Sequence, residues 1–384
     1  MKQQQQQQKG GRGGAGGGKY FSSSILDLGL SEGTKDAILV VGDGDFSYSR
    51  ALMTSLNPRN LVTTSFDTFQ ELKEKYAHVE EILNDLKAWK EKKEKEDEEE
   101  ERIKIMHGID ARRLEDTFQK NTFHRIVFMF PQSPPRKHAR NQIQHHRALL
   151  SDFLVSARKV LSEDGGAIMI SLLQGQGGTT VENNPRGHSN SWYLNLAAAN
   201  ASLLISDVQK VDREKLHLLG YVSRGYMNGA REFLVGGDPP KDDDESNMMS
   251  NKGKKNNNKK KKRKKKQQKE GWMHTILIPD GKTRGLDSPE WYYDNSFWND
   301  NQQHTAANYT FDEEKFKATI LEVLGNEHSA SLVSIEHFDS YRDVKTGRGA
   351  LGYRFKYHNP YYPLGKEASL KLNEKVLFGT PINE

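Results

Sequence analysis

The stretch AILVVGDGDF, residues 37–46, decides the fold of the first part of this chain. Its first five residues are apolar, and a short apolar run of this kind is typical of a strand buried on both faces of a parallel sheet. The run stops at Gly42-Asp43-Gly44, and residues 47–56 then have the pattern of a helix. A strand that passes through a glycine turn into a helix predicts an α/β fold with a ligand-binding loop.

Similar units follow along the chain. Further β-type runs lie at residues 61–66, 103–106, 125–130, 166–172 and 203–208. Helical patterns separate them at residues 68–89, 142–161 and 191–201, and the charged run 90–102 is expected to extend the first of these helices. Alternating strands and helices predict right-handed crossovers and a parallel sheet. We therefore expect the residues that follow the strands to meet at one edge of the sheet, the ligand edge; they are Gly42, Asp67, Asp110, Pro131 and Gly175.

The composition indicates that part of the chain is unpacked. Of 384 residues, 34% are apolar and 28% are charged, a low apolar share for one compact body. The absence of cysteine excludes disulfides, thiolate metal sites and a cysteine nucleophile, and we predict no metal site. No apolar run approaches the roughly 20 residues of a membrane span, and the N-terminus lacks a signal-type apolar stretch. We expect a soluble intracellular protein.

Two segments have low complexity. Residues 1–34 begin with a Gln- and Gly-rich stretch and are predicted to be a disordered tail. Residues 238–270 contain KKKKRKKK at 259–266 and are predicted to be a disordered insert within a first domain, 35–280. The insert interrupts an expected pairing of residues 232–235 with 272–278. Its lysines fit a nuclear-import signal, contacts to RNA phosphates or a merely solvated loop, so cytoplasm and nucleus or nucleolus both remain open.

Residues 289–384 form a second predicted unit. Strand-like patterns lie at 291–298, 331–341 and 350–357, and helical patterns at 312–324 and 366–377. This mixture predicts a small α+β domain.

The acidic residues of the glycine loop restrict its ligand. A glycine turn before a helix often holds a pyrophosphate, but Asp43 and Asp45 would repel phosphate. They suit a cationic cofactor without phosphates, such as S-adenosyl-L-methionine. Asp67 is placed for a ribose and Asp110 for an adenine amino group, although each also fits a helix cap. A NAD-dependent oxidoreductase is a weaker alternative.

The fourth predicted strand ends in FMFPQ, residues 128–132. Aromatic side chains at this point of the ligand edge could stack on a base removed from its helix. Equally, Phe128 and Phe130 could belong to the core, with Pro131 ending the strand.

Several of these blocks resemble one family in order. Residues 38–49 (ILVVGDGDFSYS), 64–67 (TSFD), 108–111 (GIDA) and 125–131 (RIVFMFP) resemble the rRNA uridine-N3 methyltransferase-like family. Residues 175–179 (GQGGT) and 190–192 (NSW) resemble the members that carry a C-terminal ferredoxin-fold anticodon-binding domain. In the second unit, residues 345–348 (KTGR) and 352–357 (GYRFKY) resemble the anticodon-binding domain at the end of phenylalanyl-tRNA synthetase.

The resemblance implies a Rossmann-like class I methyltransferase sheet followed by a ferredoxin-like α+β domain. It implies an S-adenosyl-L-methionine-dependent RNA base methyltransferase that modifies uridine at N3, with rRNA or tRNA as the partner. The cofactor residues would be Gly42, Asp43, Gly44, Asp45, Phe46, Asp67 and Asp110. Because N3 must lose a proton, substrate-side residues are needed; the candidates are His107, Phe130, Pro131 and Gln132. Basic residues near aromatics give the candidate RNA contacts Arg342, Lys345, Arg348, Arg354 and Lys356, which also fit ordinary surface charge.

The chain departs from the family pattern at two substrate-side positions. Met129 stands where the family usually has Asn, and Gln132 where it usually has His. In the second unit Tyr293 stands where the anticodon-binding domain opens with Arg. Met129 favours an alternative, a non-catalytic RNA- or tRNA-binding protein that retains the methyltransferase fold, whereas Tyr293 removes one expected phosphate contact.

Overall fold

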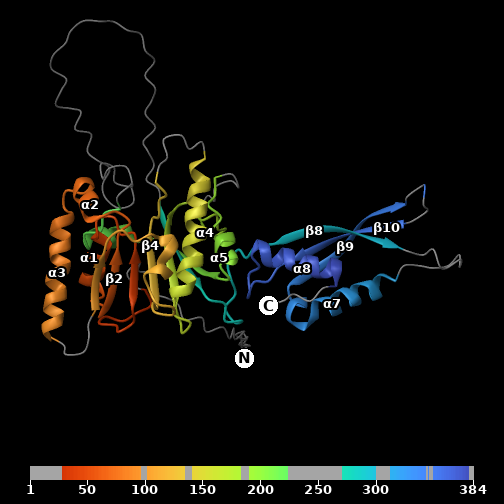
Figure 1. Cartoon of the computed structure of the whole chain (residues 1–384), viewed down its shortest axis with the longest axis horizontal. Helices are drawn as coiled ribbons and strands as arrows, with labels where there is room; N and C mark the ends of the chain where they lie inside the picture. Colours follow the sequence, from red (N-terminus) through yellow and green to blue (C-terminus); the bar gives the residue numbers. More distant parts are fainter. Residues whose placement is uncertain are drawn as a thin grey trace, which may run out of the picture.

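The computed structural model describes residues 28–96, 102–134, 141–182, 190–223, 270–299, 312–342, 345 and 349–379. Figure 1 shows two sheets that lie side by side, each with its own helices. The larger sheet is built from residues up to 277 and the smaller from residues 291–357. The predicted insert at 238–270 lies outside the described residues except for Glu270.

The larger sheet has seven strands in the order β3-β2-β1-β4-β5-β7-β6. Their bounds are β1 Ile38–Val41, β2 Asn60–Thr64, β3 Arg102–Met106, β4 Arg125–Met129, β5 Ala167–Leu173, β6 Leu204–Lys210 and β7 Gly271–Leu277. The first five pair in parallel, as the sequence predicts, whereas β7 runs antiparallel to both β5 and β6. The strand order reverses between β1 and β4, and in open α/β sheets this switch point is where ligands bind.

Helices cover both faces of this sheet, and residues of β1 explain why. Ile38 and Val40 pack into one apolar core while Leu39 and Val41 pack into another, because successive side chains of a strand point to opposite faces. The first core is completed by α1 (Ser47–Ser55), α2 (Phe69–Lys75), α3 (Val79–Glu96) and α6 (Arg213–Leu218). The second core is completed by η1 (Ala111–Asp116), α4 (Gln142–Val160) and α5 (Leu194–Asn200). The predicted α/β architecture is therefore confirmed.

Two expectations about this part of the chain are wrong, and a third concerns residues outside the described ranges. The single helix expected at 68–89 is two helices, because Tyr76 adopts an extended conformation that ends α2. The predicted tail, 1–34, is too long, since Leu28 is buried in the first core and its carbonyl accepts from Arg125 Nε at 2.6 Å. Residues 232–235, the expected partner of residues 272–278, lie outside the described ranges; β7 lies between β5 and β6.

The smaller sheet has the order β8-β10-β9, with both outer strands antiparallel to β10. Its elements are β8 Trp291–Asn299, α7 Glu313–Ser329, β9 Leu332–Arg342, β10 Gly349–Tyr357 and α8 Lys366–Phe378. Because β8 and β9 are parallel with β10 between them, they form the split β-α-β unit of ferredoxin-like folds. Tyr353, Phe355 and Tyr357 bury one face of the sheet against both helices. This confirms the predicted α+β architecture, and no fourth strand follows α8 within the described residues.

The two parts meet between α5 and α8. The Lys366 backbone N–H donates to Asn200 Oδ1 at 2.9 Å, and the Gly285 N–H donates to the Pro360 carbonyl at 2.7 Å. None of the helices in the described ranges is both long enough and apolar enough to cross a membrane.

Candidate active site

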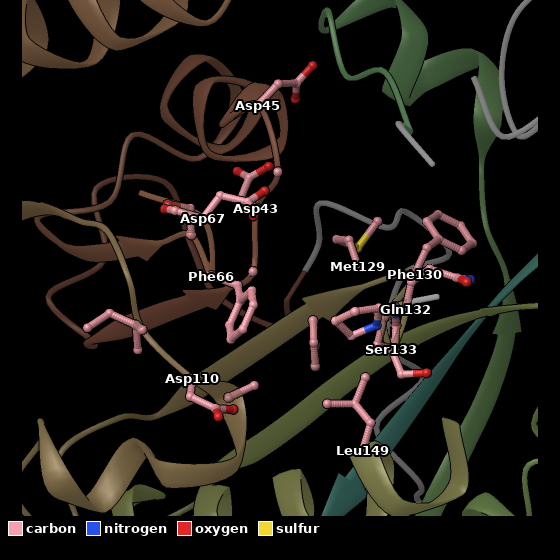
Figure 2. Close-up of a pocket in the computed structure, with 18 of the residues that line it drawn as sticks. Asp43, Asp45, Phe66, Asp67, Asp110, Met129, Phe130, Gln132, Ser133 and Leu149 are labelled. Carbon is pink, nitrogen blue, oxygen red and sulfur yellow. The ribbon is translucent and has the colours of Figure 1, made fainter. Parts of the chain in front are cut away.

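A cavity of about 370 Å³ lies at the switch point of the larger sheet, at the carboxyl ends of β1, β2 and β4. This volume is within the range of small-molecule sites. Figure 2 shows that the lining has two chemically different sides. An acidic side carries Asp43, Asp45, Asp67 and Asp110, and the side formed by β4 and α4 carries Met129, Phe130, Gln132, Ser133 and Leu149.

The glycine loop after β1 forms the floor of the acidic side. Gly42 has φ +61°, and a Cβ atom there would lie 2.9 Å from the Phe128 ring. At Gly44 a Cβ atom would lie 2.9 Å from the Tyr76 hydroxyl. The left-handed backbone therefore favours glycine at position 42, and a side chain at either position would have to displace a neighbouring aromatic ring.

The two aspartates of this loop are buried. Asp43 Oδ2 accepts from the Ser49 N–H at 2.7 Å and from Ser49 Oγ at 2.6 Å, and Asp45 Oδ1 accepts from the Ser47 N–H at 3.1 Å. Burial, together with the negative charge of Asp45, raises the pKa of Asp43 to about 7. The loop thus holds two carboxyl groups at the cavity, one of which changes its charge near neutral pH.

Asp67 and Asp110 follow β2 and β3 and have basic partners. Lys75 Nζ lies 2.6 Å from Asp67 Oδ1. Arg112 donates from Nε to both carboxylate oxygens of Asp110, at 3.0 and 3.1 Å, and from a terminal nitrogen to Oδ2 at 2.6 Å. These hydrogen bonds hold the pKa of Asp110 below its usual value. Asp110 also caps η1 by accepting from the Arg112 N–H.

Phe66 lies between these two carboxylates (Figure 2). Its ring lines the cavity and is 51% exposed, which is unusual for a phenylalanine at the end of a buried strand. Ile109 and Ala111 line the same part of the cavity. An apolar surface bordered by carboxylates fits a flat ring that carries amino or hydroxyl groups.

The opposite side begins where β4 ends. Met129 lines the cavity, and its sulfur accepts from Ser171 Oγ at 3.3 Å. Phe130 has φ +48°, so the chain turns sharply there and carries Pro131, Gln132 and Ser133 along the cavity wall. Ser133 is fixed by Gln142 of α4, whose amide donates to Ser133 Oγ at 2.8 Å.

The structure brings most of the predicted site residues to this one cavity. They are Gly42, Asp43, Gly44, Asp45, Asp67, Asp110, Phe130, Pro131 and Gln132. Phe46 and His107 are not among the lining residues. The Phe46 ring is fully buried and packs edge-on against His107 at 5.5 Å between centroids, while His107 Nδ1 lies 3.0 Å from Ser65 Oγ. Burial and the nearby Lys87 lower the pKa of His107.

Sequence reasoning did not single out three parts of the lining: Phe66, His145 of α4, and residues 221–223. Phe66 could have been noticed as an aromatic residue directly before Asp67 at a strand end. His145 gives no such signal, because adjacent histidines in a helix do not reveal which one faces a cavity. Residues 221–223 reach the site through a contact between distant segments, Val222 N–H to Ser47 Oγ at 3.3 Å.

The predicted RNA-contacting cations lie on or near the smaller sheet. Arg354 makes a two-point ion pair with Asp294 at 2.7 and 2.8 Å, and Lys356 pairs with Glu290 at 3.0 Å. Arg342 ends β9 and Lys345 follows it, whereas Arg348 lies outside the described residues. Exposed aromatic residues accompany these cations on the sheet: Tyr292, Trp298, Phe338 and Tyr341.

The order β3-β2-β1-β4-β5-β7-β6, with β7 reversed and a cavity at the switch point, defines a Rossmann-like class I methyltransferase domain. Residues 39–224 match the family model described as rRNA (uridine-N3-)-methyltransferase BTM5-like. The match covers just under half of the chain and confirms the resemblance that the sequence motifs indicated. Together, the family match and the topology support a methyltransferase of the S-adenosyl-L-methionine-dependent type.

Curated relatives are similar in sequence to about half of this chain. The human protein named ferredoxin-fold anticodon-binding domain-containing protein 1 is 30% identical over 202 residues, which are 52% of this chain. The matched region is 29% of the human protein, so the chain spans less than a third of that relative's length.

Solved methyltransferase structures show a weaker likeness. TrmN from Thermus thermophilus has a TM-score of 0.31 and 16% identity over 47% of this chain and 40% of its own. The 16S rRNA methyltransferase KamB has a TM-score of 0.34 and 13% identity over 67% of this chain and 90% of its own. At these TM-scores the fold class follows from the strand order and not from the likeness.

Proposed function

We propose that this chain is an S-adenosyl-L-methionine-dependent RNA base methyltransferase that methylates uridine at N3 in rRNA or tRNA. The observation that carries the proposal is the cavity at the switch point, with an acidic side and an apolar, amide-bearing side. The family match over 39–224 supports the reaction and the RNA substrate.

The acidic side fits S-adenosyl-L-methionine by charge and shape. Bound there, the cofactor would supply an electrophilic methyl group on a positively charged sulfur. Asp43 and Asp45 would place negative charge near its cationic amino-acid and sulfonium groups, because both residues line the cavity at the glycine loop. Asp67 would bind the ribose hydroxyls through Oδ2, since its hydrogen bond with Lys75 uses Oδ1. Phe66 and Ile109 would cover the adenine ring, with Asp110 at its amino edge.

The opposite side fits a base that has left its stack. Met129, Phe130 and Pro131 supply apolar contact surface, and Gln132 supplies an amide that both donates and accepts hydrogen bonds. The chain would hold the base so that N3 is within reach of the methyl group of the cofactor. Such alignment of nucleophile and methyl group provides a large part of the rate of a transfer reaction.

The smaller sheet would bind another part of the RNA by stacking. Trp298 and Tyr341 are 56% and 59% exposed, and both are paired with Ala350 in the sheet register, so they flank a small residue. Base stacking on such rings is worth about 1–3 kcal/mol per base. Because Arg354 and Lys356 are already paired with acidic residues, we expect stacking to contribute more than these two cations do.

A second function, non-catalytic RNA or tRNA binding, is favoured by one observation. Met129 lines the substrate side of the cavity with a thioether. An amide side chain at this position could form a hydrogen bond with the uracil edge, and a thioether cannot donate one. A cofactor-binding protein without turnover would have the same acidic side. For either function, an RNA partner fits a protein of the cytoplasm and one of the nucleus or nucleolus. In a nuclear protein, the lysine run at 259–266 would serve as the import signal.

The proposal is tested by calorimetry and by RNA mass spectrometry. We expect the full chain to bind S-adenosyl-L-methionine and not NAD, and deletion of its gene to remove one N3-methyluridine from rRNA or tRNA. Tight binding of NAD alone would contradict the cofactor assignment. Cofactor binding with an unchanged methyluridine profile would favour the non-catalytic function.

A further inference from the structure

Most polar side chains that line the cavity are already hydrogen-bonded within the protein. On the acidic side, Asp43, Asp67 and Asp110 have partners on neighbouring residues. On the opposite side, Ser133 is bonded to Gln142 and His146. Gln132 and His145 differ: among the described residues, neither side chain has a hydrogen-bond or ion-pair partner. Polar groups that line a cavity without partners are available to a ligand.

The neighbouring histidine explains how His145 comes to face the cavity. His146 is buried, its Nδ1 lies 3.2 Å from both the backbone nitrogen and Oγ of Ser133, and its ring stacks on Trp192 at 4.2 Å between centroids. Burial, and then the charge of His145, lower the pKa of His146 to about 4, as expected of a neutral structural histidine. These contacts fix the rotation of α4, so that His145, Ala148 and Leu149 line the cavity.

No other imidazole within the described residues lines this cavity. His107 lies behind Ser65, and Asp43 Oδ2 already accepts two hydrogen bonds from Ser49. The amide of Gln132 is not a base at neutral pH, so a proton acceptor is expected from elsewhere in this chain. His145 lies on the side of the cavity that carries Gln132. Asp110, at the start of η1, also lines the cavity, but its negative charge is paired with the positive charge of Arg112.

We infer that His145 is the catalytic base of this site and that Gln132 binds the uracil edge beside it. The inference rests on the proposed function. A uracil presents an acceptor, a donor and an acceptor at O2, N3–H and O4, which an amide N–H and an imidazole nitrogen can satisfy. The N3 proton first passes to His145, and the electron pair of the broken N–H bond then forms the bond from N3 to the methyl carbon of S-adenosyl-L-methionine. The C–S bond breaks, its electron pair stays on sulfur, and S-adenosylhomocysteine leaves; His145 then releases the proton to water.

The first arm of the test measures turnover. The full chain is incubated with S-adenosyl-L-methionine and an unmodified transcript of large-subunit rRNA, comparing wild type, His145→Ala and Gln144→Ala. The last variant is a matched control, since Gln144 is on the same helix and exposed. We expect His145→Ala to lower kcat at least about 100-fold, the usual contribution of a general base, with partial rescue by added imidazole. Cofactor affinity by calorimetry should stay within about twofold.

The second arm does not depend on turnover. Histidine-labelled protein loaded with S-adenosylhomocysteine is titrated with uridine 5′-monophosphate, and the His145 ring signal is assigned by its absence in His145→Gln. We expect this signal to shift with uridine monophosphate and much less with its N3-methyl derivative, which lacks the proton.

The outcomes separate the inference from the proposed function. Wild-type turnover in His145→Ala, with an unmoved ring signal, would overturn the role of His145 and leave the methyltransferase intact. A wild-type protein that methylates no uridine, but whose His145 signal responds to uridine monophosphate alone, would overturn the proposed function and support the contact. Loss of cofactor binding in His145→Ala would show that the residue belongs to the acidic side, contrary to the inference.

Discussion

The acidic side of the cavity and the side formed by β4 and α4 differ in how many of their polar groups already have hydrogen-bond partners within the protein. Each of the four carboxyl groups on the acidic side accepts hydrogen bonds from residues nearby: Asp43, Asp45, Asp67 and Asp110. On the opposite side Gln132 and His145 lack such partners among the described residues. A cofactor that is the same in every cycle is best bound by groups held in place beforehand. A base that must enter and leave requires groups that it can pair with on arrival.

The largest expected effect comes from Gly42→Ala. The new methyl group would meet Phe128 at 2.9 Å in a left-handed conformation, so the loop must move out of the cavity. We expect cofactor affinity to fall at least about 100-fold and the free energy of unfolding to fall by roughly 1–3 kcal/mol. The control is Gly33→Ala, which has φ +69° but open space around the added atom. Equal losses of cofactor affinity in both variants would contradict a role for the loop.

Asp43→Asn should weaken the cofactor while stabilising the protein. The pKa of Asp43 is raised to about 7, so the folded state holds this proton more tightly than the unfolded chain does. The contribution of Asp43 to stability is therefore lost as pH rises from about 4 through 7, and the charge that attracts the cofactor appears over the upper part of that range.

At pH 8 we expect the free energy of unfolding of Asp43→Asn to exceed that of wild type by on the order of 2 kcal/mol. We expect the variant to bind S-adenosyl-L-methionine about tenfold more weakly than wild type. Wild-type affinity should rise with pH through 7, and that of the variant should not. Asp116→Asn, an exposed carboxylate paired with Arg113, serves as the control. Parallel pH profiles of cofactor affinity in wild type and Asp43→Asn would refute the assignment.

Phe66→Ala should reduce cofactor affinity about fivefold, because the ring offers its exposed face to the adenine site. Phe69→Ala is a suitable control, since Phe69 is also exposed but is not among the lining residues. The measurement is calorimetry with S-adenosylhomocysteine. Equal affinity for Phe66→Ala and wild type would mean that the adenine lies elsewhere.

An effect of similar size is expected outside the cavity. Trp298→Ala should weaken binding of a short single-stranded RNA about threefold to tenfold and leave cofactor affinity unchanged. Tyr362→Ala removes a similarly exposed ring away from the sheet strands and should have no effect. Trp298 fluorescence that does not respond to RNA would exclude the smaller sheet as a stacking surface.

Much of the fold follows from local sequence pattern. The spacing of apolar residues indicates which face of an element is buried, and glycine turns mark where an element ends. The strand at 37–41 and its loop were predictable for this reason. The break at Tyr76 was not, since the apolar spacing continues across it and only its packing beside Gly44 ends the helix. The reversed β7 follows a long segment outside the described residues, so its direction had no local signal.

The cavity lining could be predicted where residues follow strands but not where helices supply them. The carboxyl ends of parallel strands meet at one edge, and Asp67 and Asp110 lie at the cavity for this reason. His107 also follows a strand, yet it turns behind Ser65, and His145 reaches the cavity only through the rotation of α4. Such rotations depend on tertiary contacts, here those of His146 with Ser133 and Trp192.

The central claim is that this cavity brings a methyl group to uracil N3. It is tested most directly by incubating the full chain with S-adenosyl-L-methionine bearing a deuterated methyl group and an unmodified large-subunit rRNA transcript, followed by nucleoside mass spectrometry. The predicted result is deuterated N3-methyluridine in wild type and almost none in Gly42→Ala or His145→Ala. Labelled methyl groups on another base, or none on any base while the cofactor binds, would contradict the claim.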